Sequence, residues 1–250
     1  MGIKLLLIMP LAFVAEFVDS SLGMGYGTSL TPILLLMGFE PMQVVPAVLF
    51  SEFVSGISAA CFHHSVNNVD FKGNTQDMRV AIILSIFSVI GTVVAVFVAI
   101  NLPAKILKLW IGIIVVSMGV FIVATFNRTP RFRWRKIITV GTIASFNKGL
   151  SGGGYGPLVM GGQMLSGIGV KNAVAITSLA EGVTCLAGVI LYVFMKDTVD
   201  WTLAPWLMAG AVLSVPFAVH TLKWLNERLA KVLIAVVMTI LGILTIMKAF

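Results

Sequence analysis

The stretch FVDSSLGMGYGTSLTPILLLMGF, residues 17–39, contains the pentapeptide GMGYG at residues 23–27, and the pattern returns as GGGYG at residues 152–156. Both pentapeptides lie inside apolar segments, at about residues 4–37 and 134–167, that otherwise suit helices. Each glycine destabilises a helix interior by about 1 kcal/mol relative to alanine. Three or four glycines within five residues therefore predict that both segments break at these points.

The composition predicts a helical membrane protein. Of the 250 residues, 58% are hydrophobic and 11% are charged, and the mean hydropathy is +1.04. A soluble domain of this length cannot bury so much apolar surface, whereas a bilayer accepts it on the protein exterior. Apolar runs of about 20 residues exclude the ~10-residue alternating strands of a membrane β-barrel. The expected fold class is an all-α polytopic membrane protein.

The broken segments are too long, and their arms too short, for ordinary spans. A helix over residues 4–37 would be about 50 Å long, against a hydrocarbon core of about 30 Å. We therefore expect a broken helix or a re-entrant hairpin whose tip lies inside the protein, where non-helical backbone is tolerated. Each half then continues with a Glu-bearing helix and two plainer spans, at about 42–64, 79–100 and 104–126, and at about 171–195, 202–222 and 229–249.

An ordered series of matches indicates an internal duplication. At a shift of 129 residues the two pentapeptides coincide, Gly38 falls on Gly167, and Glu52 falls on Glu181. We predict two pseudo-symmetric repeats, 1–127 and 128–250, within one integral membrane domain. Because a hairpin plus three spans crosses the membrane an odd number of times, the repeats are predicted to be inverted.

A basic linker at 127–136 predicts the topology of the chain. The net charge is +7, and the linker contains Arg128, Arg131, Arg133, Arg135 and Lys136. Between two membrane spans such a cluster follows the positive-inside rule, so we place it in the cytoplasm and expect no nucleic-acid partner. A lipid or partner site is the alternative.

The glycine tips are candidate anion-binding sites. Non-helical Gly, Ser and Thr leave backbone N–H groups free to face a ligand, backed by the positive end of the following half-helix. Matching broken helices in two repeats indicate a transporter's substrate site. The alternatives are close helix packing for the glycines and bonding to helix carbonyls for the hydroxyls. The candidate substrate-binding residues are Ser20, Ser21, Gly23, Gly25, Tyr26, Gly27, Lys148, Ser151, Gly152, Gly153, Gly154 and Tyr155.

Charged side chains inside apolar segments raise a second question. A lysine there is costly unless it meets an anion, so Lys148 either holds the substrate or pairs with Asp19, its counterpart at the 129-residue shift. Glu52 and Glu181 are mid-helix carboxyl groups, suited either to proton coupling or to bracing each helix against the adjacent glycine tip. Glu16 raises the same question more weakly.

The remaining titratable residues form no metal cluster and no catalytic triad, so we expect no metal, no cofactor and no enzymatic activity. His63 lies near the end of the predicted helix 42–64. Its position favours the membrane interface over a proton relay.

At the paired motifs the chain resembles the TauE/SafE family of membrane transporters, the sulfite exporters and toluene sulfonate uptake permeases. The residues behind the resemblance are FVDSSLGMGYGTSLTPILLLMGF with AVLFSEFVSG, and SFNKGLSGGGYGPLVMGGQMLSGI with AVAITSLAEGV. The resemblance implies transport of sulfur oxyanions, organosulfonates or other small organic acids across the plasma membrane. The second half has NKG where the first has DSS, an asymmetry that could tune which anion fits.

The leading hypothesis is a secondary active transporter that exports a small sulfur-containing anion by alternating access around the two tips near the bilayer midplane. Proton coupling, contact with membrane lipids and a homodimer are compatible with it, as is a multi-pass location in a bacterial inner membrane. The alternatives are a transporter of another small organic anion and an ion channel that uses the two GYG motifs. The missing Thr-Val of a potassium filter and the nearby Lys148 charge both oppose the channel.

Overall fold

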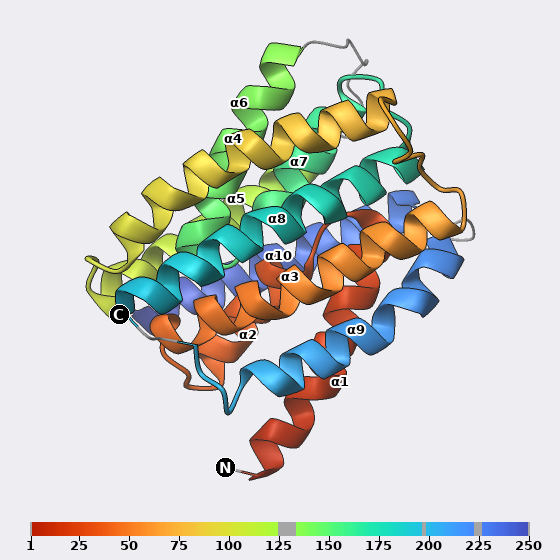
Figure 1. Cartoon of the computed structure of the whole chain (residues 1–250). Coiled ribbons are helices and arrows are strands. Elements are labelled where there is room, and N and C mark those ends of the chain that lie inside the picture. The colour runs from red at the N-terminus through yellow and green to blue at the C-terminus, as the bar shows by residue number, and fades with distance from the viewer. Residues whose placement is uncertain (1, 125–133, 197–198, 223–226, 250) are drawn as a thin grey trace.

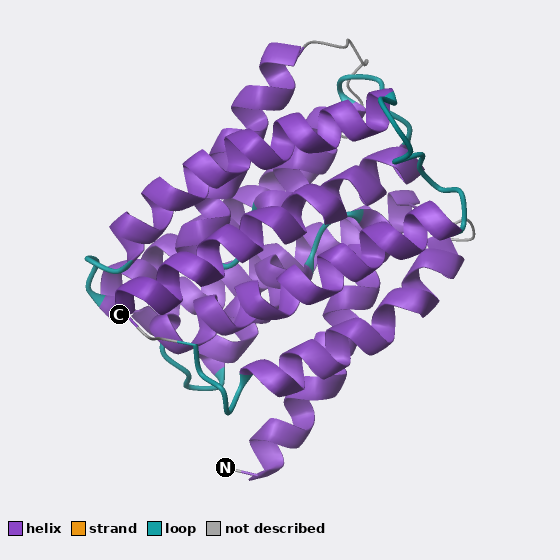
Figure 2. Cartoon of the chain, viewed as in Figure 1, coloured by secondary structure: helices purple, strands orange, loops and turns teal. Residues whose placement is uncertain are grey.

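The computed structural model describes residues 2–124, 134–196, 199–222 and 227–249. Within these ranges the chain forms helices and short connections, with no strand (Figure 2). The helices are α1 (Gly2–Leu22), α2 (Tyr26–Leu36), α3 (Pro41–Ser65), α4 (Gln76–Ala99), α5 (Ala104–Ala124), α6 (Trp134–Ser151), α7 (Tyr155–Met164), α8 (Val170–Lys196), α9 (Ala204–Thr221) and α10 (Glu227–Ala249). The predicted all-α fold class is confirmed.

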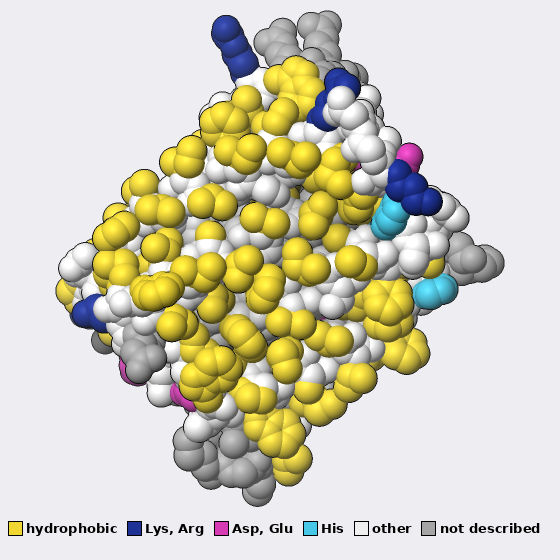
Figure 3. Space-filling view, in the orientation of Figure 1, with side chains coloured by type: hydrophobic (Ala, Val, Ile, Leu, Met, Phe, Trp, Pro, Cys, Tyr) yellow, Lys and Arg dark blue, Asp and Glu magenta, His cyan; other side chains and the backbone are white. Residues whose placement is uncertain are grey.

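Six of the described helices are long and apolar enough to cross a bilayer: α3, α4, α5, α8, α9 and α10. Their bounds agree to within a few residues with the spans predicted from the sequence. Exposed apolar side chains recur along them, as at Ile82, Ile86 and Ile90 on α4. Figure 3 shows such side chains covering the middle of the visible face, with the charged side chains near its ends. This surface suits a protein embedded in lipid.

The other four helices form two hairpins. The α2 helix has 11 residues and α7 has 10, so at about 1.5 Å per residue neither can cross a ~30 Å core. Figure 1 shows the 37–40 connection after α2 and the 165–169 connection after α7 at opposite ends of the bundle. The α1–α2 hairpin therefore opens toward one end, and the α6–α7 hairpin opens toward the other.

The helix ends follow local sequence signals. Glu40 and Gln43 form a reciprocal capping box at the start of α3, and the Thr75 side chain accepts a hydrogen bond from the amide of Met78 at the start of α4. Gly23 and Gly152 directly follow α1 and α6 with φ of 68° and 72°. A residue with a side chain rarely adopts this left-handed conformation, so glycine is the residue that ends both helices cleanly.

The packing partners of the two halves correspond. The α1 helix packs on α9 and α6 packs on α4, while α3 packs on α9 and α8 packs on α4. The α3 and α8 helices also pack on each other, as do α5 and α10. When α1–α5 of the first half are matched in order with α6–α10 of the second half, the α1–α9 contact corresponds to the α6–α4 contact. In the same way, the α3–α9 contact corresponds to the α8–α4 contact. The inverted repeat of 1–127 and 128–250 stays a prediction, and of the basic linker only residues from Trp134 onward lie in the described ranges.

Candidate functional site

The two glycine motifs meet at the centre of the bundle. We call residues 23–25 the first elbow and residues 152–154 the second, because each separates two helices. A Cβ atom on Gly27 would overlap the carbonyl oxygen of Gly152, and one on Gly156 would lie 2.5 Å from the carbonyl oxygen of Gly23. The predicted breaks are present at both motifs. The packing alternative also holds, because the hairpin tips touch backbone to backbone.

The amino end of α2 is held by a carboxylate of the protein itself. The amide of Tyr26, the first residue of α2, donates to Asp19 Oδ1 at 3.1 Å. At the second elbow the amide of Gly153 donates to Ser151 Oγ at 3.1 Å. The two helix amino ends therefore differ, because the position that matches Asp19 is occupied by Lys148. The Asp19 contact therefore occupies one of the amides that were predicted from the sequence to be free to bind an anionic ligand.

Lys148 is buried between two glutamates. Its side chain is 1% exposed, and Nζ lies 2.7 Å from Glu181 Oε1 and forms a second ion pair with Glu52 Oε2. The predicted pair with Asp19 is wrong in this structure: α6 turns its lysine toward α3 and α8, while Asp19 bonds to α2. The glutamates thus brace the lysine rather than the glycine tips.

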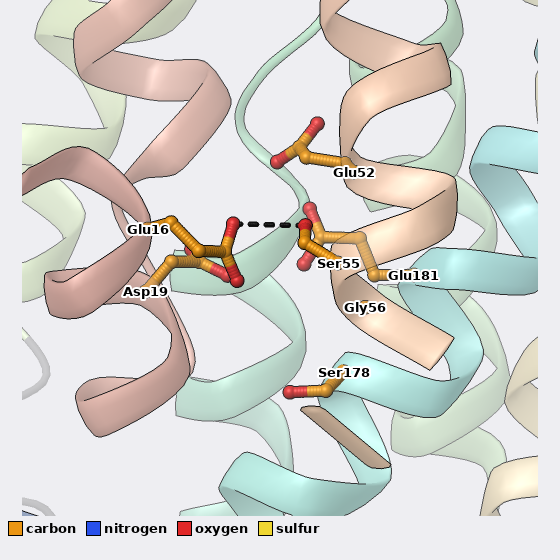
Figure 4. A pocket seen from close by; sticks show the side chains of 7 residues that line it. All are labelled: Glu16, Asp19, Glu52, Ser55, Gly56, Ser178 and Glu181. Atoms are coloured by element: carbon orange, nitrogen blue, oxygen red, sulfur yellow. Dashed lines mark hydrogen bonds between the residues drawn. The ribbon is translucent and has the colours of Figure 1, made fainter. Parts of the chain in front are cut away.

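A small cavity lies beside this ion-pair cluster, between α1, α3 and α8. Its lining consists of Glu16, Asp19, Glu52, Ser55, Gly56, Ser178 and Glu181 (Figure 4). The cavity volume is about 10 Å³. A single buried water needs about 10–15 Å³ on this scale, so an oxyanion of four or more heavy atoms cannot enter without movement of the surrounding helices.

Two serines satisfy Glu16, whereas Glu52 has an open oxygen. Ser20 Oγ donates to Glu16 Oε1 at 2.6 Å, and Ser55 Oγ donates to Glu16 Oε2 at 3.0 Å. Glu52 is 3% exposed, and its Oε1 atom has no hydrogen-bond partner within the described ranges. A buried acceptor without a partner is costly, so this atom is a point where a ligand or proton would be stabilising.

The candidate hydroxyl donors bond to the protein. The Tyr26 hydroxyl lies 2.6 Å from Ser51 Oγ, and the Tyr155 hydroxyl lies 3.0 Å from Ser88 Oγ. Ser21 Oγ donates to the carbonyl of Phe17. Neither tyrosine lines the cavity. The two phenols instead tie the hairpins to α3 and α4.

The backbone geometry of the first GYG motif differs from a carbonyl-lined filter. Tyr26 and Gly27 are the first two residues of α2, and the carbonyl of Gly25 accepts the amide of Ser29 at 2.9 Å. A potassium filter needs carbonyl oxygens that point into a pore. At Gly25 the carbonyl is used by the helix.

His63 is fully buried within the protein, two residues before the end of α3, and its interfacial position stays a prediction. Its Nε2 lies 3.0 Å from the carbonyl oxygen of Ser20, and its Nδ1 lies 3.1 Å from Asn68 Nδ2. Because the Asn68 amide can only donate, Nδ1 accepts and Nε2–H donates. The histidine thus caps a free carbonyl at the carboxyl end of α1, next to the first elbow.

The sequence left three lining residues unnoticed: Ser55, Gly56 and Ser178. Ser55 follows Glu52 by three residues, and Ser178 precedes Glu181 by three. Residues three apart lie on the same helix face, so Ser55 and Ser178 could have been predicted as neighbours of Glu52 and Glu181 one turn along each helix. Within the described ranges, no three His, Cys, Asp or Glu side chains are placed to hold a metal ion.

The Asp19 contact makes a stability prediction. We expect Asp19→Ala to be less stable than Asp19→Asn by about 1 kcal/mol, since both remove the charge but only asparagine keeps an acceptor for the Tyr26 amide. Thermal unfolding of the two purified variants in the same detergent measures the difference. Equal melting temperatures would show that the bond to α2 contributes nothing.

Comparisons with known proteins agree with this architecture. Residues 8–245 match the family described as Sulfite exporter TauE/SafE. A probable membrane transporter protein of Bacillus subtilis (strain 168), YtnM, is 26% identical over 245 residues, which is 92% of this chain and 79% of the relative. A probable membrane transporter protein of Methanocaldococcus jannaschii, MJ0441, is 25% identical over 204 residues, covering 76% of this chain and 74% of that protein. The chain is thus a multi-pass membrane protein and belongs to the TauE/SafE family of membrane transporters.

Proposed function

We propose that this transporter is a secondary active exporter of a small sulfur-containing anion, such as sulfite or an organosulfonate. The observation that best supports this proposal is the contact between two hairpin tips that enter the bundle from opposite ends. One of these hairpins has the buried Lys148 on its α6 arm. Broken helices in corresponding positions of two halves are typical of transporter binding sites. The family description supports sulfite as the substrate and export as the direction.

The contact between the tips supports alternating access as the proposed mechanism. The first hairpin separates the centre from one end of the bundle, and the second separates it from the other end. Withdrawing one hairpin from the backbone contact at Gly27 and Gly152 would open the centre to one side only. Because the cavity has room for about one water, such a movement is required before an anion can enter. Lys148 then supplies the positive charge that an anion needs in a low-dielectric centre.

The distribution of cations supports an orientation. Of the cations beside the described helix ends, Lys72, Arg79, Arg135, Lys136 and Lys171 belong to the end where α4, α6 and α8 begin. Arg128, Arg131 and Arg133 fall between α5 and α6 in the sequence, outside the described ranges. The opposite end has Lys105, Lys108, Lys196 and Lys248. The positive-inside rule then places the opening of the α6–α7 hairpin in the cytoplasm and that of α1–α2 outside, in the plasma membrane.

The test is flux into proteoliposomes that contain the purified protein. We expect sulfite movement above that of protein-free liposomes, with competition from methanesulfonate and taurine and little from acetate. Currents of potassium would instead support a channel, and flux restricted to carboxylates would support the alternative substrate class. Liposomes with all molecules in one orientation, loaded from either side, measure the preferred direction. Lys108→Met serves as a control because its ion pair with Glu40 lies at the surface.

A further inference from the structure

We propose that Glu52 and Glu181 form a proton-operated latch on Lys148. Protons that reach the central cavity neutralise the two carboxylates, release the ammonium group, and allow it to bind the anionic substrate. The proposal rests on the proposed anion transport and adds its coupling ion. Anion and proton then move together, in the direction set by the sum of their two gradients. Because the inward gradient of protons opposes export in this coupling, export is driven by the anion's own outward gradient, which must exceed the gradient of the protons that move with it, and is not driven by protons.

The first argument is the charge of the buried centre. Glu16, Asp19, Glu52 and Glu181 are each at most 8% exposed, and the cation among them is Lys148. If every group were ionised, one positive and four negative charges would leave a net charge of −3 (1 − 4). Charges removed from water are stable only when they are paired or neutralised. The surplus of carboxylates therefore calls for further cations, and an added substrate anion increases that need.

The second argument is the open oxygen of Glu52. Its Oε2 pairs with Lys148, whereas its Oε1 is buried without a hydrogen-bond partner within the described ranges. Glu52 lines the cavity (Figure 4), so a proton that arrives through the cavity finds an acceptor there. By contrast, both oxygens of Glu16 accept serine hydroxyls and Asp19 accepts the Tyr26 amide. Among the four carboxylates, Glu52 therefore has the oxygen that is fully buried without a hydrogen-bond partner within the described ranges.

The geometry favours a proton over a metal ion. A cavity of about 10 Å³ has no room for an additional hydrated cation. The ammonium of Lys148 already occupies the position between Glu52 and Glu181 that a metal would take. No group of three acidic, His or Cys side chains in the described ranges is arranged as a metal site. A proton needs no coordination shell, so it can neutralise a carboxylate where it stands.

The other buried titratable groups of this centre lie on α1, α2, α3, α7 and α8. These are Glu16 and Asp19 on α1, Tyr26 on α2, Glu52 and His63 on α3, Tyr155 on α7, and Glu181 and Cys185 on α8. The two phenols bond to serines, His63 bonds to the Ser20 carbonyl, and Cys185 Sγ lies 3.9 Å from Glu52 Oε2. In the described structure Lys148 forms its ion pairs with Glu52 and Glu181, so protonation of these two carboxyl groups is what changes its pairing.

The first experiment needs no substrate. Infrared difference spectra of the full-length protein in nanodiscs are recorded between mildly alkaline and mildly acidic pH. We expect a carboxylic acid carbonyl band that appears on acidification and weakens in Glu52→Gln and in Glu181→Gln. Glu40→Gln is the matched control, because Glu40 is exposed and pairs with Lys108 at the surface. If the wild-type protein lacks such a band, or if the band is unchanged in both variants, the proposed protonation of Glu52 and Glu181 is wrong.

The second experiment uses methanesulfonate, whose own charge is constant over this pH range. In the wild type we expect its affinity to rise as the pH falls, by up to tenfold per pH unit for each proton bound with the anion. Glu52→Gln and Glu181→Gln should flatten this dependence, since glutamine mimics a carboxyl group that already has its proton. Equal slopes in wild type and both variants, or a dependence on sodium in place of choline, would contradict proton coupling.

The two experiments separate this inference from the proposed function. If methanesulfonate and sulfite fail to bind at every pH while the infrared band behaves as expected, the proton site stands and the anion proposal fails. If anion binding is present without the band, transport of the anion stands and the latch is wrong. Should one glutamine variant fail to fold, the other variant and the wild-type spectrum still decide the outcome.

Discussion

Lys148→Met is expected to abolish sulfite flux and to lower the stability of the protein. The substitution keeps a similar length and apolar stem but leaves Glu52 and Glu181 buried without their shared cation. Removing one partner of a buried ion pair costs about 3–5 kcal/mol. We expect the loss of stability to be greatest at high pH, because protons neutralise the two stranded carboxylates as the pH falls.

The control for this variant is Lys108→Met, which removes a half-exposed ion pair with Glu40. Surface pairs contribute about 0–1 kcal/mol, so both flux and melting temperature should change little. A triple variant, Lys148→Met with Glu52→Gln and Glu181→Gln, should recover stability without recovering flux. Replacing a whole buried ionic cluster is often neutral, whereas breaking it is not. Normal sulfite flux in Lys148→Met would remove the lysine from the transport site.

Gly27→Ala is expected to be the most damaging change at the elbows. Its new Cβ atom would overlap the carbonyl oxygen of Gly152, which belongs to the backbone of the opposite hairpin and cannot rotate away. Overpacking of this kind costs about 1–3 kcal/mol, and occasionally more, because the backbone itself must shift. We expect a lower melting temperature together with reduced flux, since the contact that separates the two ends of the bundle would be forced apart.

Gly156→Ala tests the same contact from the other side, where the Cβ atom would lie 2.5 Å from the carbonyl oxygen of Gly23. Gly169→Ala is the matched control, because its Cβ atom would make only an ordinary 3.6 Å contact with Asn172 at an exposed position. Thermal unfolding and flux are compared for all three. If Gly27→Ala and Gly156→Ala match the control, the hairpin tips do not depend on backbone contact.

The spanning helices and the two breaks could be predicted from the sequence because they depend on local properties. Hydropathy and length predicted the six spanning helices, and the predicted helix 42–64 became Pro41–Ser65. The clusters at 23–27 and 152–156 predicted the two breaks, since several glycines cannot remain in one helix without cost. The sequence also identified Lys148, Glu52 and Glu181 as candidate site residues, because each is a charged residue within an apolar segment.

The partners of these charged side chains could not be predicted from local properties. A helix that is apolar on nearly every side has no marked polar face, so its sequence does not indicate which residues point inward. The rotation of α6 against α3 and α8 sends Lys148 to two glutamates instead of Asp19, and the approach of α1 brings Glu16 and Ser55 together. Burial of His63 depends in the same way on α1 ending beside α3.

Local chemistry therefore established that this chain crosses a membrane, breaks at two glycine motifs and has charges where lipid would reject them. Helix packing established which of these charges meet. Hydropathy and helix breaking act within a few neighbouring residues, whereas an ion pair such as Lys148 with Glu52 joins positions far apart in the chain. Such a pair exists only when separate helices have docked at one particular rotation and depth.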